Sequence, residues 1–281
     1  MPGTLFVVAT PIGNLEDITG RALRVLREAS IIAAEDTRRT AHLLARYAIT
    51  TPTTSLHEHN EAQKSPALVA KLERGDDVAL VSDAGTPTIS DPGNRLIQAA
   101  IQAGIRVESV PGPNAVVAAL AASGLSTDAF SFLGFPPTRS KAKSEWFDRA
   151  RTIGGTIVFF EAPHRIRETL ERLRIEVGDC PIVVCRELTK RHEELVRGPI
   201  STVLEKMAPP LGEFTVVAYI GQTTNNAVRP APSDQNILAE FGELTKSKLM
   251  SRRRAVSTLA KRHGVGANLI YELIETAKKS I

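Results

Sequence analysis

Short apolar runs alternate with amphipathic stretches along most of the chain, and this alternation limits the possible folds more than any other feature. The runs are rich in Val, Ile and Phe and lie at residues 5–9, 31–34, 78–82, 106–110, 130–134, 156–161, 181–187 and 213–220. Between them, residues 19–29 and 164–177 place apolar side chains at helical spacing. Strands that alternate with helices predict an α/β protein with mainly parallel sheets, covered on both faces.

Two breaks in this pattern divide the chain of 281 residues. The segment VPGPNA at 110–115 ends one apolar run and precedes a helix of small residues, which predicts a first α/β domain at 1–114 and a second at 115–222. Residues 223–236 are polar, contain prolines and lack periodicity, as in a linker. Residues 237–281 are helical in pattern, and 255–274 has helix-turn-helix spacing with Gly264 at the turn.

The positive charge is concentrated in the C-terminal segment. From Lys246 onward the sequence contains nine Lys and Arg residues and two Glu residues, which gives a net charge of +7. Because the net charge of the whole chain is +4, residues 1–245 carry −3. A basic tail on a mildly acidic body favours a polyanionic partner, above all a nucleic acid. A solubilising tail is the open alternative.

Several broad classes of protein do not fit the sequence. No apolar run approaches the ~20 residues of a membrane helix, and the N-terminal segment lacks the pattern of a signal peptide. The spacing of Cys180 and Cys185 suits neither a zinc site nor a redox pair. We therefore expect a cytoplasmic protein with reduced cysteines and no membrane partner.

The common nucleotide and catalytic motifs are absent: there is no GxGxxG, GxxxxGK[ST], HExxH or GxSxG. In an open α/β sheet, ligands bind beyond the carboxyl ends of the strands, so the loops after the apolar runs are the candidates. Six of these loops combine polar residues with Gly, Pro or charged pairs: TPIGNLEDIT, EDTRRT, DAGTPTISDPG, PGPNA, APHR and CRELTKR. Such a concentration is what a binding crevice requires.

These loops and their strands resemble the signature blocks of the tetrapyrrole methylase superfamily: VVATPIGNLEDIT, AAEDTRRT, LVSDAGTPTISDPG, VPGPNA, SGLSTDAFSFLGFPP, FFEAPHR and CRELTKRHEE. The resemblance covers roughly residues 4–220, with the blocks in order. Within the superfamily the chain is most similar to the branch that methylates the ribose 2′-hydroxyl of a cytidine in the decoding region of small-subunit (16S) ribosomal RNA. Asn114 and Ala162 depart from the pattern, which has serine at both positions.

The resemblance implies two α/β domains with S-adenosyl-L-methionine in the cleft between them, a homodimer, and 16S rRNA or the small ribosomal subunit as partner. It implies close backbone approach to the cofactor at Ala84 and Gly85, although an Asx-type turn explains part of that loop. Asn114 also suits a helix N-cap, and Phe160 also suits the core. The implied cofactor contacts are Pro11, Ser82, Asp83, Ala84, Gly85, Thr88, Asn114, Ala115, Phe160, Glu161 and Glu187.

The substrate side is expected at other loops and in the tail. An acid–arginine set at a strand end can orient a ribose and hold a phosphate, and a ribose hydroxyl must lose its proton during methyl transfer. The candidate catalytic residues, among which the base stays open, are Glu35, Asp36, Arg38, Glu58 and Lys190. The candidate substrate contacts are Asn14, Asp17, Arg39, Arg253, Lys261 and Arg262. His57 and His59 lack further ligands, so no metal site is expected.

Two other functions remain open on the sequence. A tetrapyrrole methyltransferase keeps the enzyme class and changes the substrate, but a small macrocycle needs neither the basic tail nor the TPIGN loop. A regulator that senses S-adenosyl-L-methionine and binds nucleic acid depends on the tail alone.

Overall fold

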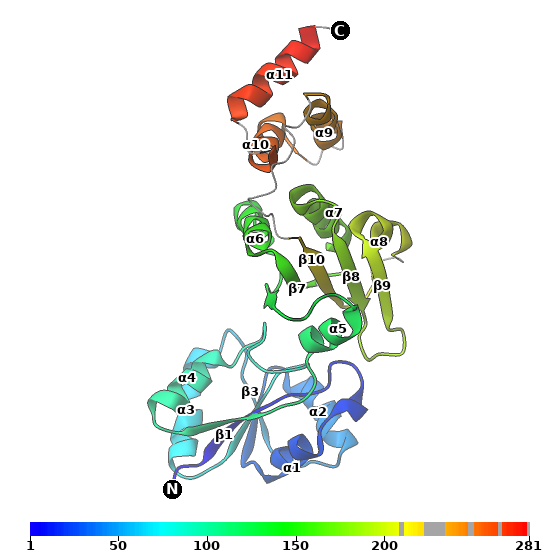
Figure 1. Ribbon diagram of the computed structural model, residues 1–281. Helices are drawn as coiled ribbons and strands as arrows, with labels where there is room; N and C mark the ends of the chain where they lie inside the picture. Colours follow the sequence, from blue (N-terminus) through cyan, green and yellow to red (C-terminus); the bar gives the residue numbers. More distant parts are fainter. Residues whose placement is uncertain (208–210, 222–233, 247–249, 264–265, 280–281) are drawn as a thin grey trace.

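The computed structural model describes residues 1–207, 211–221, 234–246, 250–263 and 266–279. The described residues form two five-stranded sheets, each with its own helices, and a group of C-terminal helices (Figure 1). The α/β class is confirmed. The division into domains at 1–114 and 115–222 stays a prediction that agrees with the separation of the two sheets.

The first sheet is entirely parallel, with the strand order β3-β2-β4-β1-β5. Its strands are β1 (Thr4–Val8), β2 (Ile31–Ala34), β3 (Thr53–Ser55), β4 (Val78–Val81) and β5 (Arg106–Val110). Its helices are α1 (Gly20–Glu28), α2 (Thr37–Arg46), α3 (Glu61–Glu73) and α4 (Asn94–Gln102), with a short 3₁₀ helix at Leu15–Asp17. Apolar clusters on both faces, one with α1 and α2 and one with α3 and α4, explain the continuous apolar runs.

The register of the first sheet brings its loops together at one edge. Ala34 of β2 lies opposite Val81 of β4, and Val8 of β1 lies opposite Val110 of β5. The strands therefore end at nearly the same height, so the loops that follow β1, β2, β4 and β5 are neighbours. This is the edge at which the sequence predicts a crevice.

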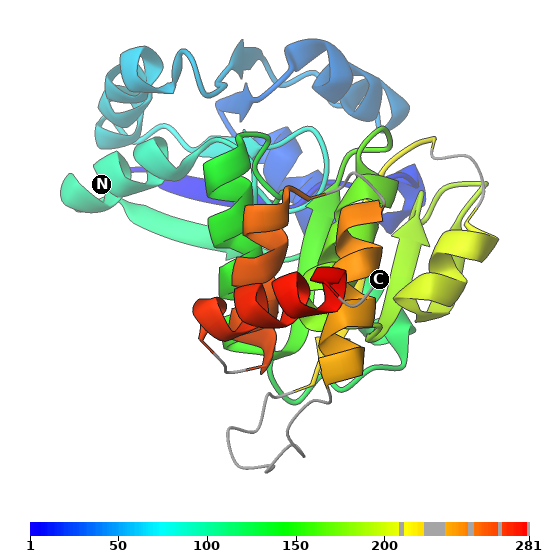
Figure 2. The ribbon, with the colours of Figure 1, turned by 90° about the horizontal axis from the view of Figure 1, so that it is seen from above.

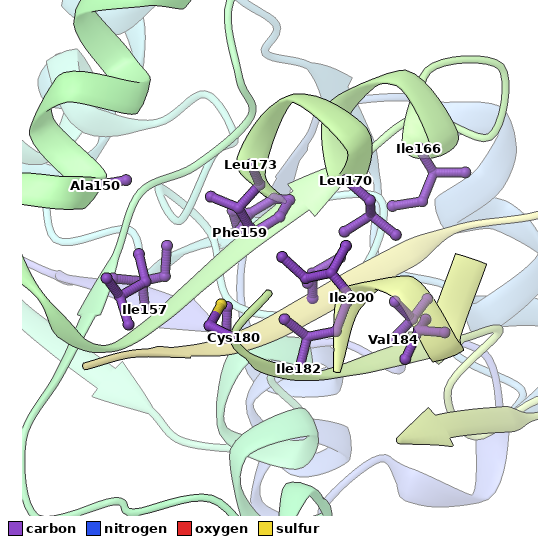
Figure 3. Close-up of a cluster of buried hydrophobic side chains, with 14 of the residues drawn as sticks. Ala150, Ile157, Phe159, Ile166, Leu170, Leu173, Cys180, Ile182, Val184 and Ile200 are labelled. Atoms are coloured by element: carbon purple, nitrogen blue, oxygen red, sulfur yellow. The ribbon is translucent and has the colours of Figure 1, made fainter. Parts of the chain in front are cut away.

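The second sheet has the order β6-β7-β10-β8-β9 and is mixed. Its strands are β6 (Phe130–Phe132), β7 (Gly155–Glu161), β8 (Pro181–Arg186), β9 (Glu194–Pro199) and β10 (Phe214–Ile220), and its helices are α5 (Ala115–Ser123), α6 (Ser140–Ile153), α7 (Ile166–Val177) and α8 (Ile200–Lys206). Figure 3 shows Ile157 and Phe159 of β7 packed with Leu170 of α7 on one face. The intervening Val158 points to the other face, where it packs with α5.

The prediction of mainly parallel strands is wrong for this second sheet. Only the β6–β7 pair is parallel, whereas β10 is antiparallel to both β7 and β8, and β9 is antiparallel to β8. The connection from β8 to β9 spans residues 187–193 without a helix, so it is too short for a parallel crossover. A buried apolar run such as β10 reads the same in either direction, which is why the sequence pattern did not reveal the orientation.

The C-terminal helices are α9 (Asp234–Lys246), α10 (Arg252–His263) and α11 (Ala267–Lys279). They share a core that includes Leu259 and Ile270, and Ile175 of α7 packs against it, so this tail rests on the second α/β unit (Figure 2). Helix α9 begins inside the predicted linker at 223–236, of which 223–233 lies outside the described residues, as does Gly264. In the described part of the chain, no helix is both long and apolar enough to cross a membrane.

Candidate active site

A cavity of about 280 Å³ lies between the two α/β units, at the carboxyl ends of β4, β5 and β7. The first unit and the segment that leaves it contribute Ile12, Ala84, Gly85, Thr86, Ile89, Ser90, Asp91 and Asn114. The second unit contributes Ala115, Phe135, Phe160, Glu161, Ala162, Pro163, Cys185, Leu188, Gly212, Glu213, Phe214 and Thr215. The cavity therefore exists only where both units meet.

Gly85 holds one wall of the cavity against the loop that follows β1. Its N–H donates to the Thr10 carbonyl (3.0 Å) and its carbonyl accepts from the Thr10 N–H (2.8 Å). Its φ of +81° is in the left-handed region that favours glycine. A Cβ at this position would lie 3.3 Å from Cγ2 of Ile12, which lines the same cavity. Both the backbone conformation and the available space call for glycine.

The rest of this loop is strained. Thr88 (φ +74°) and Ser90 (φ +68°) have left-handed backbone conformations without being glycine, which costs on the order of 1–3 kcal/mol each. The buried carboxylate of Glu61 stabilises the end of the loop, because its Oε1 accepts N–H groups from Gly93 (3.2 Å), Arg95 (2.7 Å) and Leu96 (3.2 Å). Glu61 thus caps the N-terminus of α4, a role that its position in the sequence does not reveal.

Aromatic side chains form the wall on the side of the second sheet. The ring of Phe160 lies 4.9 Å from that of Phe132 and 5.4 Å from that of Phe135, between ring centroids. Phe135 is 51% exposed although it is a large apolar residue, and it lines the cavity together with Phe160. Phe160 therefore combines the two interpretations that the sequence left open: it packs in the core and faces the cavity.

Asn114 and Glu161 use their side chains within the protein. Oδ1 of Asn114 accepts the N–H groups of Val116 (3.0 Å) and Val117 (3.2 Å), which confirms the N-cap of α5. The side chain of Glu161 is fully buried, and Nη2 of Arg165 lies 2.6 Å from its Oε1. The Glu161 carboxylate also accepts hydrogen bonds from the Thr169 hydroxyl (2.6 Å) and the N–H of Ala162 (2.7 Å). What Glu161 presents to the cavity is its backbone.

Acidic residues from β2 and β4 meet beside the cavity. The N–H of Asp83 donates to Oε2 of Glu35 (3.2 Å), and Oδ1 of Asp83 accepts the N–H of Asp36 (3.0 Å). Oδ2 of Asp83 pairs with Arg39 (3.3 Å). These contacts bring the predicted acid–arginine set against the DAGTP loop, and they direct the Asp83 carboxylate toward β2 and away from the cavity lining.

Asp91 also lines the cavity, and the sequence did not single it out. Burial raises its pKa to about 6 despite a hydrogen bond from Ser82, and the negative charges of Glu35 and Asp83 raise it further. Burial also raises the pKa of Glu35. The pKa of Asp36 is lowered because the side chain and N–H of Arg38 donate to its carboxylate.

The structure places six of the predicted cofactor residues on the cavity: Ala84, Gly85, Asn114, Ala115, Phe160 and Glu161. The other five lie outside its lining: Pro11, Ser82, Asp83, Thr88 and Glu187. Glu187 instead accepts from Lys190 (2.9 Å) and from the N–H of Glu213 (2.9 Å). Partial burial alone lowers the pKa of Lys190, but hydrogen bonds to Glu213 and Glu187 outweigh it and raise that pKa.

The predicted substrate contacts, together with the catalytic candidates Arg38 and Glu58, are spread over the surface. Asn14 caps the 3₁₀ helix at Leu15–Asp17, and the side chain of Arg38 is 89% exposed while it pairs with Asp36 (2.7 Å). Asp17, Glu58, Arg39 and Arg253 are exposed as well. Lys261 and Arg262 belong to α10, but their side chains lie outside the described part of the structure. Among the described residues, no group of three or more His, Cys, Asp or Glu is arranged to hold a metal ion.

Both cysteines, which the sequence predicts to be reduced, are free thiols, and both are buried. Burial raises the pKa of Cys180 to about 11 and that of Cys185 to about 12. Their thiols are therefore protonated and unreactive at neutral pH, even though Cys185 borders the cavity.

An α/β protein with a cavity between two sheets and no dinucleotide motif corresponds to a known class. The sequence model of the family described as Tetrapyrrole (Corrin/Porphyrin) Methylases matches residues 4–204. Among solved structures, the methyltransferase CobJ is similar with a TM-score of 0.60 and 20% identity, over 81% of this chain and 98% of that one. Diphthine synthase is similar with a TM-score of 0.59 and 16% identity, over 77% and 89%. These likenesses concern the fold.

Curated relatives are much more similar in sequence. The ribosomal RNA small subunit methyltransferase I of Synechocystis sp. is 42% identical over 274 residues, 96% of this chain and 97% of that protein. The protein of the same name from Vibrio cholerae is 41% identical over 273 residues, 95% and 93%. The chain belongs to the tetrapyrrole methylase family, and within it to the group of ribosomal RNA small subunit methyltransferase I.

The cofactor of this family group is S-adenosyl-L-methionine, and the cavity fits it. The rings of Phe135 and Phe160 offer an apolar surface for a purine, and Thr86 and Ser90 add hydroxyl groups beside it. Gly85 leaves open the space that a Cβ would take beside Ile12. A mostly apolar cavity with a few converging polar groups is typical of cofactor sites.

Proposed function

We propose that this protein transfers a methyl group from S-adenosyl-L-methionine to the ribose 2′-hydroxyl of a cytidine in the decoding region of 16S ribosomal RNA. The observation that carries the proposal is the extent of the similarity: the relatives named ribosomal RNA small subunit methyltransferase I align over 93–97% of their own length, which includes the tail. The basic balance of the tail supports a nucleic-acid substrate.

The chain's own residues supply position and proton transfer. When bound, the cofactor supplies an electrophilic methyl group on a positively charged sulfur. Ala84, Gly85 and the Phe160 wall orient it by shape. Because the methyl donor is already reactive, most of the catalytic effect comes from alignment of the ribose hydroxyl with it.

The proton of the hydroxyl needs an acceptor. Among the carboxylate residues that line the cavity, Glu161 pairs with Arg165 and Glu213 pairs with Lys190, so Asp91 is the candidate. A carboxylate with a pKa of about 6 is ionised at neutral pH and is still more basic than an ordinary aspartate. Of the candidates from the sequence, Asp36 has a lowered pKa and Lys190 a raised one, so both are poor acceptors at neutral pH. Glu35, whose pKa is raised, stays beside Asp91 as the second candidate.

Asp91→Asn is expected to separate activity from stability. In the folded protein the pKa of Asp91 is about 6, above its ordinary 3.8, so folded Asp91 holds its proton longer than unfolded Asp91 as the pH rises. Stability is therefore lost between about pH 4 and pH 6 and is not regained above it. The variant should be more stable than the wild type at pH 8, equally stable below about pH 4, and strongly impaired in methylation at every pH.

Thermal unfolding at pH 4 and pH 8, with methylation rates from pH 5 to pH 9, tests this. The methylation rate of the wild type should rise as the pH increases through about 6. Glu35→Gln is measured in the same way, because Glu35 is the second candidate acceptor. A variant that methylates at the wild-type rate would remove Asp91 from the chemistry. If Asp91→Asn is no more stable than the wild type at pH 8, burial of the ionised Asp91 carboxylate does not lower the free energy of unfolding.

Mapping of 2′-O-methylation on small-subunit RNA tests the function itself. The purified protein with S-adenosyl-L-methionine should add one 2′-O-methylcytidine to unmodified 16S RNA or to small subunits. Glu35→Ala and Arg38→Ala should lower the rate strongly while cofactor affinity stays nearly unchanged, because neither residue lines the cavity. Wild-type rates in both variants would place the RNA elsewhere, and absence of any methylated ribose would end the proposal.

The same proposal includes a homodimer and a cytoplasmic location, where ribosomal subunits are assembled. Both follow from the family resemblance. Analytical ultracentrifugation of the purified protein tests the dimer, with a single species at twice 30.4 kDa as the expected result.

A further inference from the structure

A second cavity, of about 300 Å³, lies where the tail rests on the second α/β unit. Helix α6 contributes Lys143 and Ser144, the start of α7 contributes Arg165, and α10 contributes Arg254. In Figure 1, α10 lies above α6 and α7, on the side of these helices that faces away from the first sheet. The tail and the second α/β unit therefore form this cavity together. The sequence analysis did not predict a site at any of its charged residues.

Positive charge dominates the lining. Four cations (Lys143, Arg165, Arg172 and Arg254) face it, against one carboxylate, Glu168. Two of the cations also have partners outside the lining, since Arg165 pairs with Glu161 and Arg172 with Glu176. Lys143 pairs with Glu168 (2.7 Å), but the Glu168 side chain is 66% exposed, so water weakens that pair. Arg254 has no ion-pair partner among the described residues, so it adds an unpaired positive charge to this part of the lining.

Arg165 is the fixed element of the lining. Its Nη2 is held by the buried carboxylate of Glu161 (2.6 Å), and its Nη1 donates to the Pro136 carbonyl (3.1 Å). Its Nε is buried and has no acceptor in the described part of the chain. Arg165 therefore contributes a fixed positive charge, and hydroxyl groups of Thr138, Ser140 and Ser144 lie in the same lining as hydrogen-bond donors.

We propose that this cavity binds a backbone phosphate of the substrate RNA. Lysine, arginine and hydroxyl side chains are the usual donors to phosphate oxygens, and such contacts fix the register of a nucleic acid without reading its sequence. The Glu161–Arg165 pair connects the two cavities, since the backbone of Glu161 lines the first and Arg165 lines the second. A phosphate held here would position the RNA strand relative to the methyl donor. This inference rests on the proposed function for the identity of the polyanion.

The test compares residues inside the cavity with matched neighbours outside it. Lys143→Gln and Arg254→Gln remove one cation each from the lining. The controls are Lys141→Gln, where the side chain is 93% exposed, and Arg149→Gln, which is also exposed; both residues lie on α6 and neither lines the cavity. Binding of unmodified 16S RNA to the full-length protein is measured between 50 and 200 mM salt, with cofactor affinity and melting temperature as parallel readouts.

Each cavity variant should bind RNA more weakly and should flatten the slope of log affinity against log salt by about 1, with cofactor affinity unchanged. The double variant should lose less than the sum of the two, because both cations contact one phosphate. Controls should keep a slope near that of the wild type. Cavity variants that match the controls would overturn the proposal.

A lowered melting temperature with an unchanged slope would overturn it as well, because the cations would then only attach the tail to the body. The outcome is separable from that of the proposed function. RNA binding is measured without turnover. If the cavity variants flatten the salt slope as expected but the wild-type protein produces no methylated cytidine, the proposed methylation is contradicted and the phosphate site is retained.

Discussion

Replacing Gly85 with valine is expected to abolish binding of S-adenosyl-L-methionine. The backbone at this position has a φ of +81°, which a β-branched residue adopts only under strain. The new Cβ would lie 3.3 Å from Cγ2 of Ile12, and the two additional methyl groups would enter the space beside the cavity. Gly85 also exchanges two hydrogen bonds with Thr10. The strained backbone would therefore displace this wall of the cavity, in addition to the space that the valine side chain occupies.

Gly104→Val is the matched control. Gly104 has a similar φ of +69°, but a Cβ there meets nothing within 4 Å, and the residue does not line the cavity. Both variants should lose comparable stability in thermal unfolding, and calorimetry should show lost cofactor binding only for Gly85→Val. If Gly85→Val binds the cofactor with wild-type affinity, the DAGTP loop is not part of the site.

Glu161→Leu is expected to lower the free energy of unfolding by about 3–5 kcal/mol. The Glu161 carboxylate is fully buried and accepts from Arg165 (2.6 Å), Thr169 (2.6 Å) and the N–H of Ala162 (2.7 Å). Its loss leaves a guanidinium that is only 17% exposed without a counter-charge. Removal of one partner from a buried pair costs far more than the net contribution of the pair.

Urea denaturation of three variants checks this expectation. Glu168→Leu removes an exposed carboxylate from the same helix region and should cost less than about 1 kcal/mol. The double variant Glu161→Leu with Arg165→Met should recover a large part of the loss, since it leaves no unpaired charge. A cost for Glu161→Leu as small as that for Glu168→Leu would mean that Arg165 finds another partner or reaches water.

Four strands of the first sheet were predictable: β1, β2 and β4 are largely buried apolar runs, and the edge strand β5 carries Val107 and Val110. The exception is β3, whose three residues, Thr53–Ser55, are polar and lie at the sheet edge, so they carry no apolar signal. β9 was not predicted from the sequence for a similar reason: it is a partly exposed edge strand that contains Arg197 and Gly198. Edge strands need only one neighbour and one covered face, and their sequences are correspondingly weak.

The loops of the candidate site were predictable, but the directions of their side chains were not. Gly85 stands out because its surroundings in the sequence are turn-forming and small. Whether Asp83 or Asp91 faces the cavity depends on hydrogen bonds to β2, and those partners are 47 and 48 residues away in the chain. The same holds for Glu61, whose acceptor role for the N–H groups that begin α4 spans more than 30 residues. Such contacts are properties of the folded sheet order.

The position of β10 has a consequence for how the chain folds during synthesis. The first sheet has all of its strands once residue 110 has left the ribosome, so it can close early. In the second sheet the last strand in sequence is the central one, between β7 and β8. Until residue 220 emerges, both of those strands carry an open, apolar edge, the kind that pairs with other chains. The second unit is therefore the part of a growing or truncated chain that aggregates first, and truncations that end between residues 187 and 213, which keep β7 and β8 but lack β10, should be insoluble.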